Sequence, residues 1–384
     1  MKFRSSRALI SCFIVAAVLG MTFPLLAAPS TATVAPSSAG STGAPGSTVG
    51  GGSPVAPGSR VDAGLPPALE AKTLEMSARL QVPYAVLVHG QVGLEHLYAR
   101  RYREARESFE RLEREHPTSA VGPLGRVMVA QSLMSENLDF SQEEAYTRAY
   151  RETLRRAEVA LDRGEARAWN RFLRGCALAV NGIHQYRHDK VLSALQDGWS
   201  ALQDLEEAQR IEPAFVDPVL GLGLYDYWRS SLARKYKYIP FVKDQRTEGL
   251  RKIQLARDQG FLAPTLARLA LVYSYVDLGK TDKALNVTEE LYRAYPNNVV
   301  NLQLLGQLYM RKRKYEQARN AYEQVLVADP RNVQVYYYLG QLEFRRGGDL
   351  ERARAYFNHY VLSLIHISEP TRLRRISYAV FCLK

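Results

Sequence analysis

Apolar positions in the second half of the chain recur every 34 residues, as Leu271, Leu305 and Leu339 do, and Pro296 is followed by Pro330 at the same interval. Polar and charged residues fill most of the positions between them. A period of this length is typical of a helix–turn–helix unit that buries its apolar side only against the next unit. The pattern therefore predicts a row of stacked helical hairpins.

Within one period, small and bulky residues alternate in a way that suits two crossing helices. Gly306 and Ala318 are small where the first and second helix would touch, and Tyr309 and Tyr322 would fill the space beside them. Pro330 would end the second helix. The full set of these positions is Leu302, Leu305, Gly306, Tyr309, Ala318, Tyr322, Val325 and Pro330.

The same spacing appears near the start of the chain and again near its end. Counted from Gly93, four residues fall at offsets 12, 16, 19 and 24, as their counterparts do from Gly306; they are Ala105, Phe109, Leu112 and Pro117. A last copy begins at Tyr336, Leu339 and Gly340 and slips by one residue through Gly347-Gly348 before Ala353 and Phe357. These positions closely resemble the signature of the tetratricopeptide repeat family. The resemblance implies an all-α, right-handed superhelical solenoid whose concave groove binds other proteins or peptides.

The resemblance is clearest at residues 86–119, 265–298, 299–332 and 333–362, inside a solenoid expected to span 68–362. The centre is helical but irregular, with insertions expected at 164–200 and 229–243. Ser141-Gln142-Glu143-Glu144 reads as a capping box that opens a helix through about Leu161, and Gly164 would stop that helix. No strand pattern competes with this interpretation.

The N-terminus has the layout of a secretory signal. Lys2, Arg4 and Arg7 precede an uncharged apolar run from Ala8 to Ala28, which predicts a signal peptide over 1–28, with an uncleaved membrane anchor as the alternative. Residues 29–67 are mostly Pro, Gly, Ser, Ala, Thr and Val and predict a disordered linker. We therefore expect an exported bacterial protein in the periplasm or cell envelope, or alternatively a secreted one. Contact with a membrane would be made only through the N-terminal segment 1–28, if it is retained as an anchor.

The last residues, 363–384, resemble the translation of a sequencing-adapter read-through, and we expect them to be non-native. The formal net charge of +12 falls to about +6 once the +3 of the N-terminal segment and the +3 of this tail are excluded. A net charge of this size is typical of a soluble protein and does not predict a nucleic-acid partner. Outside these two segments only Cys176 remains, so no internal disulfide is expected.

The concave groove would be lined by first-helix residues one turn apart. In this register they are Gln303, Gln307, Arg311, Tyr337, Gln341 and Arg345. Amides and guanidinium groups would suit an extended peptide that carries carboxylates, since arginine donates paired hydrogen bonds to them. The competing interpretation is a solvated polar face.

A second candidate surface is the densest aromatic stretch, formed by Tyr225, Tyr227, Trp228, Tyr236, Tyr238 and Phe241. With basic residues on both sides, it is expected to be either an interaction loop or an inserted loop packed back on the solenoid by its own aromatic rings.

Catalytic chemistry finds little support in the sequence. His184 and His188 would share a helical face at a spacing that can hold zinc, but no third ligand is near them beyond Asp189, and no nucleophile motif is present. We expect no catalytic residue, cofactor or metal, and we predict a non-catalytic exported scaffold for a partner protein or peptide. The alternative is an enzyme or metal-dependent module built on the central segment 184–241.

Overall fold

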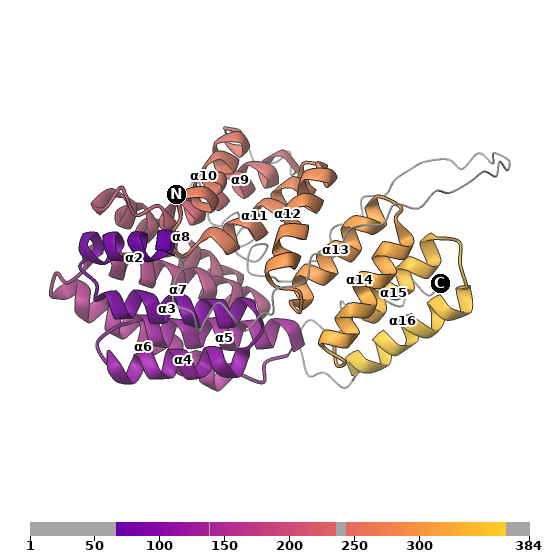
Figure 1. Cartoon of the computed structure of the whole chain (residues 1–384), viewed down its shortest axis with the longest axis horizontal. Coiled ribbons are helices and arrows are strands. Elements are labelled where there is room, and N and C mark those ends of the chain that lie inside the picture. Colours follow the sequence, from indigo (N-terminus) through magenta and orange to yellow (C-terminus); the bar gives the residue numbers. More distant parts are fainter. Residues whose placement is uncertain (1–66, 138, 236–242, 366–384) are drawn as a thin grey trace.

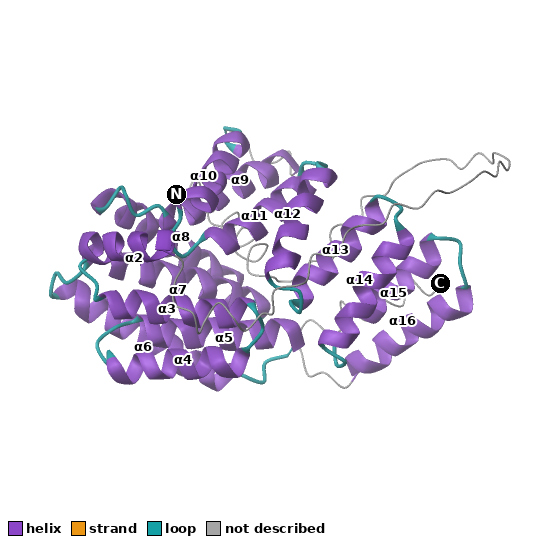
Figure 2. Ribbon diagram, viewed as in Figure 1, coloured by secondary structure: helices purple, strands orange, loops and turns teal. Residues whose placement is uncertain are grey.

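The computed structural model describes residues 67–137, 139–235 and 243–365, and this part of the chain contains helices and no strands (Figure 2). The expected signal segment, nearly all of the expected linker and most of the expected non-native tail lie outside the described residues. The predicted all-α class is confirmed.

Fifteen helices follow one another with short connections in the described residues, most of them as antiparallel hairpins. A first helix, α2 (Pro67–Leu80), precedes them. The hairpins are α3/α4 (Tyr84–Tyr98, Tyr102–Glu115), α5/α6 (Val121–Asn137, Glu143–Asp162), α7/α8 (Arg167–Arg187, Val191–Ile211), α9/α10 (Asp217–Lys235, Arg246–Gln259), α11/α12 (Pro264–Asp277, Thr281–Ala294), α13/α14 (Val299–Arg311, Tyr315–Ala328) and α15/α16 (Gln334–Arg345, Leu350–Ile365).

Each hairpin packs against the next, which makes a curved α-solenoid. In Figure 1, α2 to α12 form one body, and α13 to α16 extend from it at the end of the chain. Apolar clusters run through the stack without a break between hairpins: one spans α9 to α14, and another spans α13 to α16. Since no hairpin can bury its apolar face alone, the stacking itself supplies the core.

The predicted code of small and bulky residues decides how the helices of a hairpin cross. A Cβ atom at Gly306 would lie 2.1 Å from a ring carbon of Tyr322, and one at Gly93 would lie 2.5 Å from the ring of Phe109. A Cβ atom at Gly340 would likewise lie 2.8 Å from a ring carbon of Phe357. Each aromatic ring therefore occupies the space that the missing side chain leaves.

The centre of the chain differs from the expected insertions. Residues 167–211 form a hairpin of their own, in which α7 and α8 each have 21 residues, against 13 and 14 for α13 and α14. The first expected insertion therefore reflects longer helices, which shift the repeat pattern without interrupting the stack. Of the second, 229–243, residues 229–235 belong to α9 and residues 236–242 lie outside the described residues.

The expected capping box does not form at the start of α6. The helix begins at Glu143, and the hydroxyl of Ser141 donates to Asp139 Oδ1 at 2.9 Å instead of capping the helix. The expected stop at Gly164 is present, with φ of +74°. Among the described residues, no helix combines the length and apolarity needed to cross a membrane.

Candidate functional site

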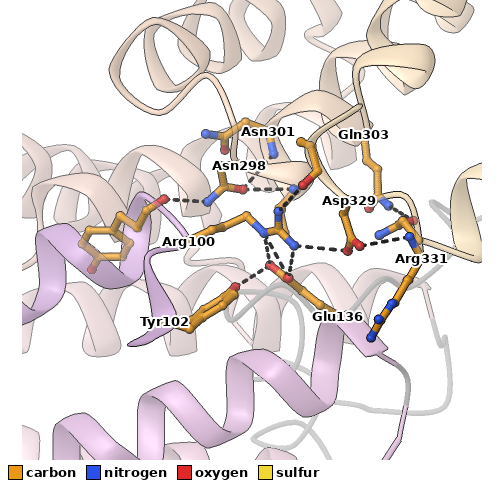
Figure 3. Close-up of polar contacts among 12 residues, drawn as sticks. Arg100, Tyr102, Glu136, Asn298, Asn301, Gln303, Asp329 and Arg331 are labelled. Atoms are coloured by element: carbon orange, nitrogen blue, oxygen red, sulfur yellow. Dashed lines mark hydrogen bonds and ion pairs between the residues drawn. The ribbon is translucent and has the colours of Figure 1, made fainter. Parts of the chain in front are cut away.

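The solenoid closes on itself, because the first hairpin contacts a loop 200 residues later (Figure 3). The hydroxyl of Tyr295 donates to the carboxylate of Glu95 at 3.0 and 3.1 Å, and Asn298 Nδ2 donates to the carbonyl of Tyr98 at 2.9 Å. The rings of Tyr98 and Tyr295 lie 5.8 Å apart. These contacts hold α3 against the connection from α12 to α13.

Arg100 is the charged centre of this contact. Its Nη2 donates to Glu136 at 2.8 Å and to Asp329 at 3.2 Å, so one guanidinium joins α5 to the end of α14. Tyr102 donates to the same Glu136 carboxylate at 2.5 Å. We call the following residues the closure interface: Glu95, Tyr98, Arg100, Tyr102, Glu136, Tyr295, Asn298 and Asp329.

Arg100 reaches across because of its position in the repeat. It occupies the turn between the two helices of its hairpin with φ of +60°, the place held by Gly279, Arg313 and Gly347 in later hairpins, with φ of +71°, +57° and +68°. A left-handed residue at this point lets the chain reverse direction. Here the residue also carries a long cationic side chain, which extends from the turn to the facing hairpins.

Inside the closed body lies an apolar cavity of about 210 Å³, lined by residues of α3, α5, α7, α8, α9 and α11. Its wall includes Leu87, Leu94, Met128, Leu173, Leu224 and Leu266. A second space of about 120 Å³ adjoins it against the closure interface. No lysine or arginine lines the larger cavity within the described residues, so this inner face does not offer the cations expected for an acidic peptide.

The cavity wall contains two polar groups, a carboxylate that is already hydrogen-bonded and a thiol that stays protonated. The carboxylate of Asp217 accepts backbone N–H groups from Phe261, Leu262 and Ala263 at 2.5 to 3.1 Å, which ties α9 to the start of α11. Burial raises the pKa of the Cys176 thiol to about 12, so it remains a thiol rather than the reactive thiolate at neutral pH. The structure gives neither group a catalytic partner among the described residues.

The six residues expected to line the groove form three pairs that differ in burial. Gln303 and Tyr337 are buried, at 4% and 6% exposure, and lie inside the repeats instead of on a groove. Gln303 donates to Asn332 at 3.0 Å, and Tyr337 accepts a hydrogen bond from Gln341 at 2.7 Å. Gln303 is covered where the chain enters the next hairpin, whereas Tyr337 is covered by Phe357 and Tyr360 of its own hairpin. Gln307 and Gln341 are half-buried.

Arg311 and Arg345 are exposed in the last turns of α13 and α15, where the C-terminal ends of helices favour cations. Although the residue as a whole is exposed, partial burial of its guanidinium, and secondarily the charge of Arg345, lowers the pKa of Arg311. Nearby cations have acidic partners: Lys312 contacts Asp282, and Arg346 contacts Glu316 at 3.1 Å. Within the described residues, no carboxylate lies within ion-pair distance of Arg311 or Arg345. Two neighbouring positive charges therefore face solvent without a counter-ion from this part of the chain.

The aromatic stretch is a helix where it is described, not a loop. Tyr225, Tyr227 and Trp228 belong to α9, and Tyr227 is fully buried, with its hydroxyl donating to the carbonyl of Ser274 and to Asp277. Burial raises the pKa of Tyr227 far above its ordinary value, with the charge of Asp277 adding to the effect. Tyr227 therefore packs α9 on α11, and Tyr236, Tyr238 and Phe241 lie outside the described residues.

The histidine pair has a third neighbour that the sequence did not reveal. Glu143, the first residue of α6, places Oε1 3.1 Å from His184 Nε2 and Oε2 3.3 Å from His188 Nε2. Burial lowers the pKa of His184 below its ordinary value, although Glu143 opposes the shift. Because Glu143 is 41 residues from His184, no local motif could have identified it. Residues of the closure interface escaped the sequence analysis for the same reason.

Comparison with known proteins agrees with this architecture of paired helices. Models described as tetratricopeptide repeat match residues 266–298 and 304–363. These segments coincide with α11/α12 and with α13 to α16. The fold is a helical-hairpin solenoid, and these two segments of it are tetratricopeptide repeats. No curated protein matches the sequence.

Solved structures of the same kind resemble the chain only distantly. A tetratricopeptide repeat protein from Parabacteroides merdae is 13% identical and covers 82% of this chain and 99% of its own, with a TM-score of 0.38. Human IFIT1, solved as a dimer with m7Gppp-AAAA, is 16% identical and covers 77% and 72%, with a TM-score of 0.38. Yeast Tom70 is 13% identical and covers 76% and 68%, with a TM-score of 0.37. At these scores the neighbours carry no argument about what this chain binds.

Proposed function

We propose that the protein is a non-catalytic scaffold, exported from the cytoplasm, that binds an acidic segment of a partner protein along α13 and α15. Tetratricopeptide folds are commonly protein-interaction modules, which supports the general class. The partner segment would lie across the exposed ends of these helices, with Arg311 and Arg345 donating to its carboxylates.

The observation that carries this proposal is the pair of arginines without an acidic neighbour. Like charges placed together cost free energy unless an anion lies between them. A bound carboxylate would accept forked hydrogen bonds from each guanidinium. Gln307 and Gln341, half-buried one turn before each arginine, are placed to hydrogen-bond the backbone of the same segment.

The test uses affinity capture with the full chain and two charge-reversal variants. Arg311→Glu/Arg345→Glu removes the proposed site, while Arg352→Glu/Arg354→Glu makes the same change of net charge at exposed positions of α16. We expect the first variant to lose a partner that the second retains, and we expect capture to weaken as salt concentration rises, since exposed charge pairs are screened.

An identical set of captured proteins for both variants would overturn the assignment of the site. Circular dichroism of each variant checks that the helices remain intact. A partner whose binding is insensitive to both reversals would have to use another surface of the solenoid.

Export is a separate part of the proposal and rests on the arrangement of the N-terminal residues. Lys2, Arg4 and Arg7 followed by the apolar run to Ala28 supply the features that an export pathway recognises. Fusing residues 1–66 to alkaline phosphatase, which is active only after export in bacteria, tests this directly. Activity that persists after Ala16→Arg/Val18→Arg breaks the apolar run would contradict it.

A further inference from the structure

Three side chains that can bind metals converge between α6 and α7. His184 Nε2 and His188 Nε2 lie 3.1 and 3.3 Å from the two oxygens of Glu143, and one ligand atom from each residue lies within 4.8 Å of the other two. The histidines are one helical turn apart and therefore share a face of α7. Glu143 approaches that face from the first turn of α6.

Aromatic packing holds both imidazole rings in place. Tyr146 stacks on His184 with ring centroids 4.1 Å apart, and Phe140 lies 4.2 Å from the ring of His188. The two imidazoles are 4.7 Å apart and nearly edge to face. Ordered rings that already direct their Nε2 atoms to one point lose little freedom when they bind an ion.

The spacing suits a small tetrahedral ion. Ligand atoms at about 2.0–2.1 Å from a tetrahedral centre lie roughly 3.4 Å from one another, close to the two distances found here. Two imidazole nitrogens with one carboxylate oxygen form a donor set typical of zinc, whereas magnesium and calcium prefer oxygen ligands alone.

We propose that Glu143, His184 and His188 form a binding site for a divalent transition-metal ion, most naturally Zn²⁺. His184 is nearly buried, while the side chains of His188 and Glu143 are 24% and 41% exposed. The exposed side gives the ion a path of entry and leaves its fourth position to water. The bound ion would join the second hairpin to the third.

Affinity is expected to be moderate. The second ring nitrogen of His184, Nδ1, is buried without a hydrogen-bond partner among the described residues. Loss of such an outer partner typically costs roughly 10–100-fold in metal affinity. This site is therefore expected to bind zinc more weakly than a closed structural site with four protein ligands.

The test is a zinc titration of the full chain, stripped with a chelator and measured by competition with a chromogenic chelator at neutral pH. His188→Ala and Glu143→Gln are each expected to weaken one zinc site at least about 10-fold. The matched control is His116→Ala, because His89, Glu115 and His116 form another group of the same residue types on α3 and α4. The control is expected to leave the affinity of the proposed site unchanged.

A second readout separates metal binding from a structural role of the same residues. Zn²⁺ should raise the melting temperature of the wild-type chain and of His116→Ala but should not change that of His188→Ala. Mg²⁺ should not raise the melting temperature of any of the three proteins. Absence of zinc binding in the wild type, or equal affinity in wild type and His188→Ala, would overturn the proposal. The scaffold function does not depend on this result.

Discussion

At the residue scale, the repeat depends on positions where only a hydrogen atom fits. The ring of Tyr322 lies where a side chain at Gly306 would be, and Phe109 and Phe357 do the same for Gly93 and Gly340. Phe357 follows its glycine by 17 residues instead of 16, because the turn from α15 to α16 holds one residue more than the turn from α13 to α14. The slip seen in the sequence is therefore absorbed by the turn, and the packing is unchanged.

Gly306→Ala is expected to lower the free energy of unfolding by about 1–3 kcal/mol, because the added methyl group overpacks the crossing with Tyr322. This sign is opposite to the gain of about 1 kcal/mol that alanine brings to an open helical position. Urea unfolding of both proteins measures the difference.

Gly90→Ala is the matched control, since a Cβ atom there would lie 3.3 Å from its nearest neighbour instead of 2.1 Å. We expect a much smaller change at Gly90. Equal stability of Gly306→Ala and wild type would show that the crossing is not as close as described.

At the scale of the helix, buried polar contacts join elements that the repeat pattern treats as separate. Asp217 begins α9 and accepts three backbone N–H groups from residues 261–263, so it fixes the chain that enters α11. The aromatic stretch of α9 also joins α9 to α11, because Tyr227 is buried against α11. The sequence predicts that this stretch is either an interaction loop or a loop packed back by its own rings. Its described residues are helical, and the ring of Tyr227 has a packing role within the helix.

Asp217→Ala is expected to lower the free energy of unfolding by about 3 kcal/mol, because it leaves two buried N–H groups and one partly buried N–H group without an acceptor. Asp217→Asn should have an intermediate effect, since its amide oxygen still accepts. Chemical denaturation followed by circular dichroism measures both. As a control, Asp258→Ala removes an exposed carboxylate and should change stability by less than about 1 kcal/mol. A loss at Asp258 as large as that at Asp217 would contradict this account.

At the scale of the whole molecule, the closure interface determines which surfaces remain available. It joins α3 and α5 to the start of α13 and the end of α14 beside the apolar cavity, while Arg311 and Arg345 at the ends of α13 and α15 remain exposed. The side chains of Arg100, Glu136 and Asp329 are only 14%, 10% and 19% exposed, so their charges depend on one another for compensation.

Arg100→Glu is expected to open the solenoid, because it would place three carboxylates together in a poorly hydrated contact. We expect a larger radius of gyration by small-angle X-ray scattering and a loss of about 3 kcal/mol in stability. Arg103→Glu, at a side chain that is 82% exposed, serves as the control. An unchanged radius with Arg100→Glu would mean that the closure does not depend on this ion pair.

The sequence alone determined the helical hairpins, their 34-residue period and the small positions at which their helices cross. These features depend on residues that lie within the same helix or the same hairpin, so they form a pattern that can be recognised in the sequence. Only the tertiary structure decided that Arg100 meets Asp329, that Glu143 meets His184 and His188, and that Gln303 is covered while Arg311 is exposed. Those contacts depend on the curvature of the stack, which accumulates from a small rotation at every hairpin and is set by the packing of the whole series.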